Sequence, residues 1–107
     1  MNTRFHPEAF AEFNEAIDFY EERESGLGTE FAADIFGAID RAIAFPTGWS
    51  EIAPGVRRCQ TQRFPYGILY SIESTDVLLI LAVMHLHREP GYWKDRHDGR
   101  AQSAGSA

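Results

Sequence analysis

This chain of 107 residues is expected to fold around the stretch Val77-Leu78-Leu79-Ile80-Leu81-Ala82-Val83. The stretch opens the longest uninterrupted apolar run of the sequence, which continues to Met84. Apolar and polar residues do not alternate in it, so it predicts a strand that is covered on both faces or lies centrally in a sheet. The run is far too short to span a bilayer.

Two segments before this run predict further strands. Val56 to Arg63 and Ile68 to Ile72 mix β-branched and polar residues in rough alternation. Ser74-Thr75-Asp76 predicts a tight turn into the apolar run, so the three strands are expected to be consecutive and antiparallel. A short opening strand around Arg4 to His6 is an optional addition.

The first half of the chain predicts two helices. From Pro7 to Arg23, apolar residues recur at three and four residue steps, and acidic residues occupy most other positions. Pro7 suits the first helical turn, where its missing N–H is not needed. A second helix is predicted from about Thr29 to Ala44, where apolar residues recur every four positions. Thr29 is expected to cap its free N–H groups.

Together these elements predict a two-layer α+β domain in which a helical hairpin packs on a small, mainly antiparallel sheet. The expected order is β-α-α-β-β-β, with a helical turn at Tyr92 to Arg96. We expect one domain over residues 1–96 and a flexible polar tail over residues 97–107. The helical side chains expected to cover the sheet are Phe10, Phe13, Ile17, Ile35 and Ile39.

Composition limits the classes of function. The net charge of −6 is uneven, because residues 1–54 hold three basic and eleven acidic residues, whereas residues 55–107 hold seven basic and five acidic residues. This asymmetry suggests an acidic outer face and a separate, mildly basic working surface. The bland alternative, two solvated acidic helices, remains open.

The only cysteine, Cys59, excludes an intrachain disulfide and a structural zinc site built on cysteines. The N-terminus carries acidic residues where a signal peptide needs an apolar core, so we expect a cytoplasmic protein with no membrane partner. No cofactor is implied.

Cationic and aromatic residues gather between Arg57 and Arg96, at the predicted strand ends. Adjacent strand residues point to opposite faces, so at most one of Arg57 and Arg58 serves a one-sided site. Histidine can serve as an acid or base near neutral pH, but His85 and His87, without a carboxylate at suitable spacing, do not predict a metal site. Tyr92 is expected to be exposed and its neighbour Trp93 buried.

The predicted order and several motifs closely resemble the RelE/ParE superfamily of bacterial type II toxins, also described as plasmid stabilisation proteins. The resemblance covers about residues 4 to 96. The segments that carry it are Arg57-Arg58, Arg63-Phe64-Pro65-Tyr66, Tyr70, Ala82-Val83-Met84-His85 and Arg88-Glu89-Pro90-Gly91-Tyr92-Trp93.

The resemblance implies a small toxin that a cognate antitoxin holds inactive by covering its basic surface. RelE-like members cut messenger RNA on the ribosome, whereas ParE-like members poison DNA gyrase. The residues that would bind antitoxin or target are Arg57, Arg58, Arg63, Tyr66, Arg88 and Tyr92. The resemblance leaves open whether the assembly is a homo-oligomer or a hetero-oligomer with the antitoxin.

A nuclease needs a base, a cation for the developing charge and an acid. In a RelE-like reading, the residues that would supply these roles are Arg58, His85, Arg88 and Tyr92. However, Gly67 stands where RelE-like nucleases have a catalytic arginine, and Gln60 stands where they have a second basic strand residue. We therefore favour the ParE-like side, with a ribosome-dependent endoribonuclease and a non-toxic antitoxin-binding or co-regulatory module as alternatives.

Overall fold

The computed structural model describes residues 1–97, which form five strands and three helices. Along the chain these are β1 (Asn2–Phe5), α1 (Pro7–Arg23), α2 (Leu27–Ala44), β2 (Glu51–Ala53), β3 (Val56–Gln60), β4 (Tyr66–Ser74), β5 (Val77–His85) and α3 (Lys94–His97). The predicted α+β class and element order are confirmed. All of the expected tail except His97 lies outside the described residues.

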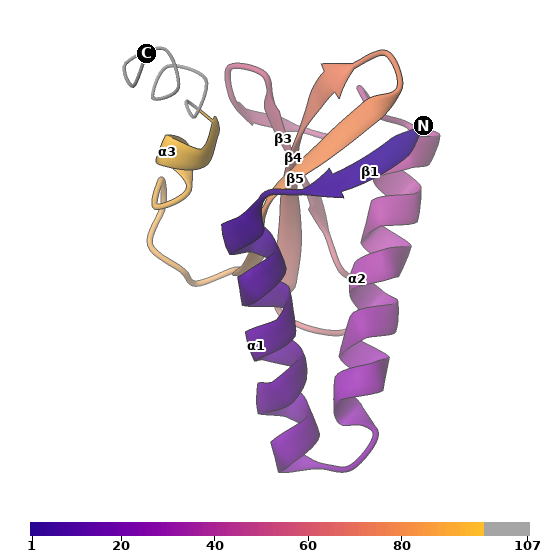
Figure 1. The fold of residues 1–107 in the computed structure, drawn as a ribbon, viewed down its shortest axis with the longest axis vertical. Coiled ribbons are helices and arrows are strands. Elements are labelled where there is room, and N and C mark those ends of the chain that lie inside the picture. Colours follow the sequence, from indigo (N-terminus) through magenta and orange to yellow (C-terminus); the bar gives the residue numbers. More distant parts are fainter. Residues whose placement is uncertain (98–107) are drawn as a thin grey trace.

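The five strands form one sheet in the order β1-β5-β4-β3-β2 (Figure 1). β1 runs parallel to β5, and the other neighbours are antiparallel. The optional opening strand is therefore real, and β5 lies inside the sheet as its sequence predicts. β2 was not predicted, because three residues followed by Pro54 are too few to show alternation.

The helices α1 and α2 lie side by side on one face of the sheet, and α3 lies apart from them (Figure 1). α1 begins at Pro7 as predicted, and the His6 side chain accepts a hydrogen bond from the Glu8 N–H at 3.1 Å. The expected cap of α2 by Thr29 is wrong, because the helix begins two residues earlier, after Gly26 at φ 91°. The Glu21 carboxylate of α1 instead accepts the N–H groups of Gly26 and Gly28.

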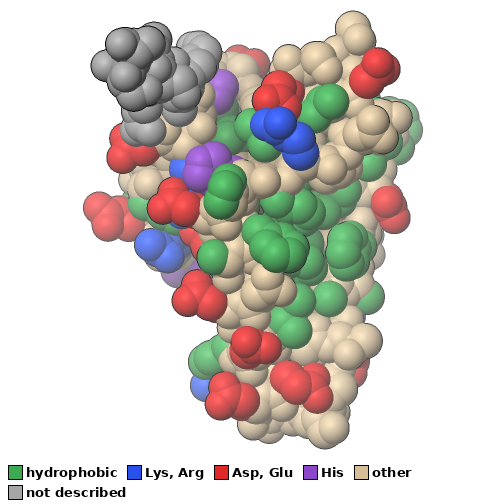
Figure 2. All heavy atoms as spheres, viewed as in Figure 1, with side chains coloured by type: hydrophobic (Ala, Val, Ile, Leu, Met, Phe, Trp, Pro, Cys, Tyr) green, Lys and Arg blue, Asp and Glu red, His purple; other side chains and the backbone are tan. Residues whose placement is uncertain are grey.

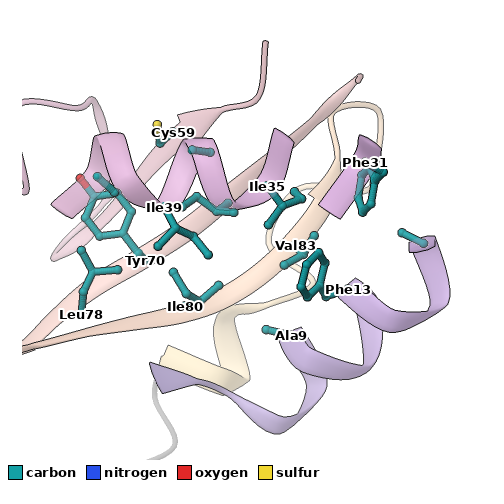
Figure 3. Close-up of a cluster of buried hydrophobic side chains, with 14 residues drawn as sticks. Ala9, Phe13, Phe31, Ile35, Ile39, Cys59, Tyr70, Leu78, Ile80 and Val83 are labelled. Atoms are coloured by element: carbon teal, nitrogen blue, oxygen red, sulfur yellow. The ribbon is translucent and has the colours of Figure 1, made fainter. Parts of the chain in front are cut away.

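The main core lies between the helices and the sheet (Figure 3). Its side chains include Phe13 from α1, Ile35 from α2, and Ile80 from β5, all of them buried. Phe10 does not belong to it, contrary to our expectation, because it is 53% exposed and Ala9 occupies the buried position. Phe10 packs edge-on against Phe5 of β1 instead.

An apolar patch remains on the outside of the helical layer. Phe10 and Phe36 are both about half exposed, and each contacts another phenylalanine ring with its edge. Figure 2 shows apolar side chains gathered on this side of the molecule, where β1 meets the hairpin.

A second, smaller core covers the sheet face that the helices leave free. Its buried side chains are Val56, Leu69, Leu81, Ala82, Met84 and Trp93. β5 thus contributes to both cores, which explains why its sequence does not alternate. Within residues 1–97 no helix is long and apolar enough to cross a membrane.

Candidate functional site

A hollow of about 320 Å³ opens on the sheet face opposite the helices. Leu69 of β4 and Met84 of β5 lie at its floor, and Ile52 of β2 lines one side. Its basic lining residues are Arg58, Arg88 and Lys94, and no carboxylate among residues 1–97 lines it. We call this the cationic hollow.

Strand geometry decides which of the two neighbouring arginines reaches this hollow. Arg58 points to it, whereas Arg57 points to the other side of β3. The Arg57 guanidinium donates to the carbonyl oxygens of Thr47 and Trp49, at 3.2 and 2.7 Å, and lies 3.6 Å from the Glu51 carboxylate. Arg57 therefore anchors the connection that leads from α2 into β2.

Gly67 faces the cationic hollow as well. A Cβ atom at this position would lie 3.6 Å from Arg58 Cγ and 3.6 Å from Leu86 Cδ2, which is ordinary contact. A longer side chain at this position would therefore reach the hollow beside Arg58. Glycine in place of the arginine of RelE-like nucleases therefore leaves the cationic hollow without a side chain at this position.

Tyr92 is half-buried, contrary to the expected exposure, and two guanidinium groups lie over its ring. The Arg88 Cζ atom is 4.0 Å and the Arg96 Cζ atom 5.0 Å from the ring centroid. The hydroxyl is buried without a hydrogen-bond partner among the described residues. Burial raises the pKa of Tyr92, and the nearby Glu12 carboxylate raises it further.

The segment of residues 86–97, here called the C-terminal clasp, is fastened to α1. Both NH groups of Arg96 donate to Glu12, at 2.8 and 2.9 Å, and the two side chains are only 9% and 15% exposed. Arg96 also donates to the Leu81 carbonyl, and Glu12 accepts the Val83 N–H. This ion pair thus satisfies main-chain groups of β5 beyond the end of β1.

A side groove of about 270 Å³ runs between α1 and the end of β5. Tyr66 and His85 line it with their rings 5.3 Å apart, and burial raises the pKa of Tyr66. Met84 and Arg88 line both this groove and the cationic hollow. No group of three or more His, Cys, Asp or Glu residues in the described chain is placed to hold a metal ion.

Arg63 lies in the β3–β4 connection, away from the cationic hollow. It is exposed, pairs with the Glu30 carboxylate of α2, and sits 5.4 Å over the Phe64 ring. Asp34 of α2 holds this connection by accepting the N–H groups of residues 62, 63 and 64. Burial tends to raise the pKa of Asp34, but these hydrogen bonds outweigh it and lower the pKa.

The predicted nuclease residues therefore do not meet at one point. Arg58 and Arg88 line the cationic hollow, whereas His85 lines the side groove. The Tyr92 hydroxyl, which a general acid would have to expose, is buried. The structure also adds Lys94, which sequence reasoning missed because a lone lysine near the chain end has no distinguishing pattern.

Apart from Arg23, which lies over the Phe19 ring, and Arg41, which donates to the Gln60 carbonyl oxygen, the Lys and Arg residues of the described chain divide into two groups. Arg58 and Lys94 form neither an ion pair nor a side-chain hydrogen bond within residues 1–97, and Arg88 lies over the Tyr92 ring without an ion pair there. The arginines with a carboxylate partner are Arg4, Arg57, Arg63 and Arg96. The cationic hollow thus collects cations that the fold itself does not pair.

Comparison with known proteins adds two findings. The family model described as "ParE toxin of type II toxin-antitoxin system, parDE" matches residues 3–90. A solved structure described as "Chromosomal ParDE TA system from P. aeruginosa" has a similar fold, with a TM-score of 0.65 and 19% sequence identity over 79% of this chain and 95% of that chain. No curated protein matches the chain.

Proposed function

Because this chain belongs to the ParE toxin family of type II toxin–antitoxin systems, we propose that it inhibits growth by acting on DNA gyrase and that a cognate antitoxin neutralises it. The proposed place of action is the cytoplasm, where gyrase works. Activity of this kind requires binding to a protein and does not require an acid–base set.

The observation that carries this proposal is the make-up of the cationic hollow. It offers Arg58 and Arg88 for binding, but arginine exchanges protons poorly at neutral pH. Gly67 adds no side chain to it, and the Tyr92 hydroxyl is buried with a raised pKa. These features favour recognition of a partner over cleavage of RNA.

Supercoiling by purified gyrase tests the proposed target. We expect micromolar toxin to inhibit the reaction, and unaffected supercoiling at that concentration overturns the gyrase assignment. Primer-extension mapping of transcripts after induction provides the matching control. New cuts inside codons would identify a ribosome-dependent endoribonuclease instead.

The antitoxin is proposed to combine apolar anchors with acidic groups. Half-exposed Phe10 and Phe36 offer apolar surface beside the helices, and Arg58 and Arg88 offer positive charge without an ion pair among the described residues.

Two growth experiments test this part. Inducing the toxin alone should arrest growth, and co-expressing the neighbouring reading frame should restore it. Normal growth on induction of the toxin alone favours a non-toxic binding module. Binding assays at low salt compare the affinity of the antitoxin for wild type and for a variant in which Arg58 and Arg88 are reversed in charge. Equal affinities would contradict an electrostatic contribution to binding.

A further inference from the structure

We propose that the cationic hollow binds a short acidic and apolar segment of the target protein. An apolar side chain of that segment enters over Leu69 and Met84, and flanking carboxylates meet Arg58, Arg88 and Lys94. This inference rests on the proposed function in one respect, namely that the toxin acts on a protein.

Charge is the first argument for an acidic partner. Three basic side chains line one hollow, and none of the described carboxylates lines it, in a chain whose net charge is −6. Arginine binds carboxylates through paired, charge-assisted hydrogen bonds. Because Arg58 and Lys94 have no side-chain partner within residues 1–97, their donors can meet a carboxylate from another protein.

The floor of the hollow supplies the apolar half of the recognition. Leu69 is fully buried in the sheet, Met84 is 8% exposed, and the large side chain of Ile52 is 40% exposed at the side. Methionine adapts its shape to different apolar groups, which suits a binding surface. The volume of about 320 Å³ is at the lower end of the range for ligand sites, so it suits one anchoring side chain better than a broad interface.

The aromatic residues favour a peptide over a nucleic acid. Proteins that bind single strands stack bases on exposed aromatic rings. Here Trp93 is only 4% exposed, and the guanidinium groups of Arg88 and Arg96 already lie over the half-buried Tyr92 ring. A net charge of −6 also opposes the approach of a nucleic acid, which is a polyanion. A short peptide carries few charges and is repelled less.

The C-terminal clasp completes the site. Pro90, Gly91 and Lys94 line the hollow from this segment, and the Arg96–Glu12 ion pair holds the segment against α1. The ion pair and the buried Trp93 side chain therefore both hold this wall of the hollow in place.

Amide chemical shifts measured by NMR on the full chain test the proposal directly. The probe is a hexapeptide, acetyl-Asp-Glu-Leu-Phe-Glu-Asp-amide, and the control peptide carries Lys at each acidic position. A thymidine hexanucleotide tests the nucleic-acid alternative. We expect only the acidic peptide to shift the Leu69, Met84 and Leu86 signals in a saturable way at about 1 mM.

Two variants and one control locate the charges responsible. Arg58→Glu and Lys94→Glu should each weaken binding of the acidic peptide by about tenfold or more. Arg4→Glu carries the same change in charge at a residue that pairs with Glu73, and it should change affinity by less than about twofold. The spectra themselves report whether each variant folds.

Three outcomes overturn the proposal: no saturable shifts in the hollow, equal binding by the variants, or tighter binding of the oligonucleotide there. Gyrase inhibition without peptide binding overturns this inference and leaves the proposed function standing. Peptide binding without gyrase inhibition overturns the gyrase assignment and leaves this inference standing.

Discussion

Neighbouring arginines on β3 show how the two faces of the sheet differ. Arg57, on the helical side, is held by two carbonyl oxygens and a carboxylate. Arg58, on the open side, has no partner among the described residues and lines the cationic hollow. Cations on the first face stabilise the fold, whereas cations on the second remain available to a partner.

The same contrast separates Arg96 from Arg88, although both guanidinium groups lie over the Tyr92 ring. Arg96 is nearly buried and pairs with Glu12, but Arg88 reaches solvent. A buried charge must be paired to be tolerated, and an exposed one need not be. Mutations should therefore affect stability on one side and binding on the other.

Breaking the buried ion pair should have the largest effect. Glu12→Gln leaves Arg96 without its main partner, so we expect the free energy of unfolding to fall by about 3 kcal/mol. Urea denaturation measures the loss. Glu22→Gln, on the exposed side of α1, is the matched control and should change stability little. A loss below about 1 kcal/mol would show that the clasp is held by other contacts.

Removing the Asp34 carboxylate should cause the second largest loss of stability. Asp34→Ala leaves three main-chain N–H groups without their acceptor and should cost about 2 kcal/mol at neutral pH. Exposed Asp40 on the same helix provides the control variant Asp40→Ala.

The effect of Asp34 should also depend on pH. Its folded-state pKa is lowered, so its contribution is fully present above the unfolded pKa of about 4. That contribution is lost as the pH falls through the folded-state pKa. Urea midpoints of wild type and Asp34→Ala should therefore converge in acid, and a constant difference down to about pH 2 would contradict the assignment.

Replacing each β3 arginine in turn compares the two faces most closely. Arg57→Leu loses two hydrogen bonds from a charged group and should lower stability by about 1.5 kcal/mol. Arg58→Leu removes an unpaired charge beside an apolar floor and should leave stability unchanged or raise it by about 0.5 kcal/mol. Thermal unfolding of the two variants decides this, and equal destabilisation would remove the distinction between the faces.

The smallest effect is expected at Arg63. Its ion pair with Glu30 is exposed, so Arg63→Ala should change the free energy of unfolding by less than about 0.5 kcal/mol. Denaturation at low and high salt should give the same difference from wild type. A larger loss at low salt would show that this surface pair contributes to the fold.

The fold could be predicted largely because its signals are local. The apolar run in β5 indicated burial on both faces, and the spacing in α1 gave the helix its observed limits. The predictions were wrong where contacts between residues far apart in the sequence determine the structure. The free N–H groups at the start of α2 donate to the Glu21 carboxylate of α1. In α1, the buried position is taken by Ala9 and not by Phe10.

The candidate site could be predicted only in part. Arg58 and Arg88 were found because strand-end cations are visible in sequence. Their separation from Arg57 and Arg63 depends on which carboxylates the fold brings near each side chain. Glu12 and Lys94 were not predicted as site residues. Glu12 acts by contacting β5 and the C-terminal clasp, and Lys94 reaches the hollow only because the clasp folds back onto the sheet.

Inhibition of gyrase by three matched proteins tests the central claim most directly. Supercoiling is titrated with wild type, Arg58→Glu and Arg4→Glu, after equal unfolding midpoints have been established. The account predicts inhibition by wild type and Arg4→Glu at similar micromolar concentrations, and at least about tenfold weaker inhibition by Arg58→Glu. Equal inhibition by all three would contradict a role for the cationic hollow, and no inhibition by wild type would contradict the target itself.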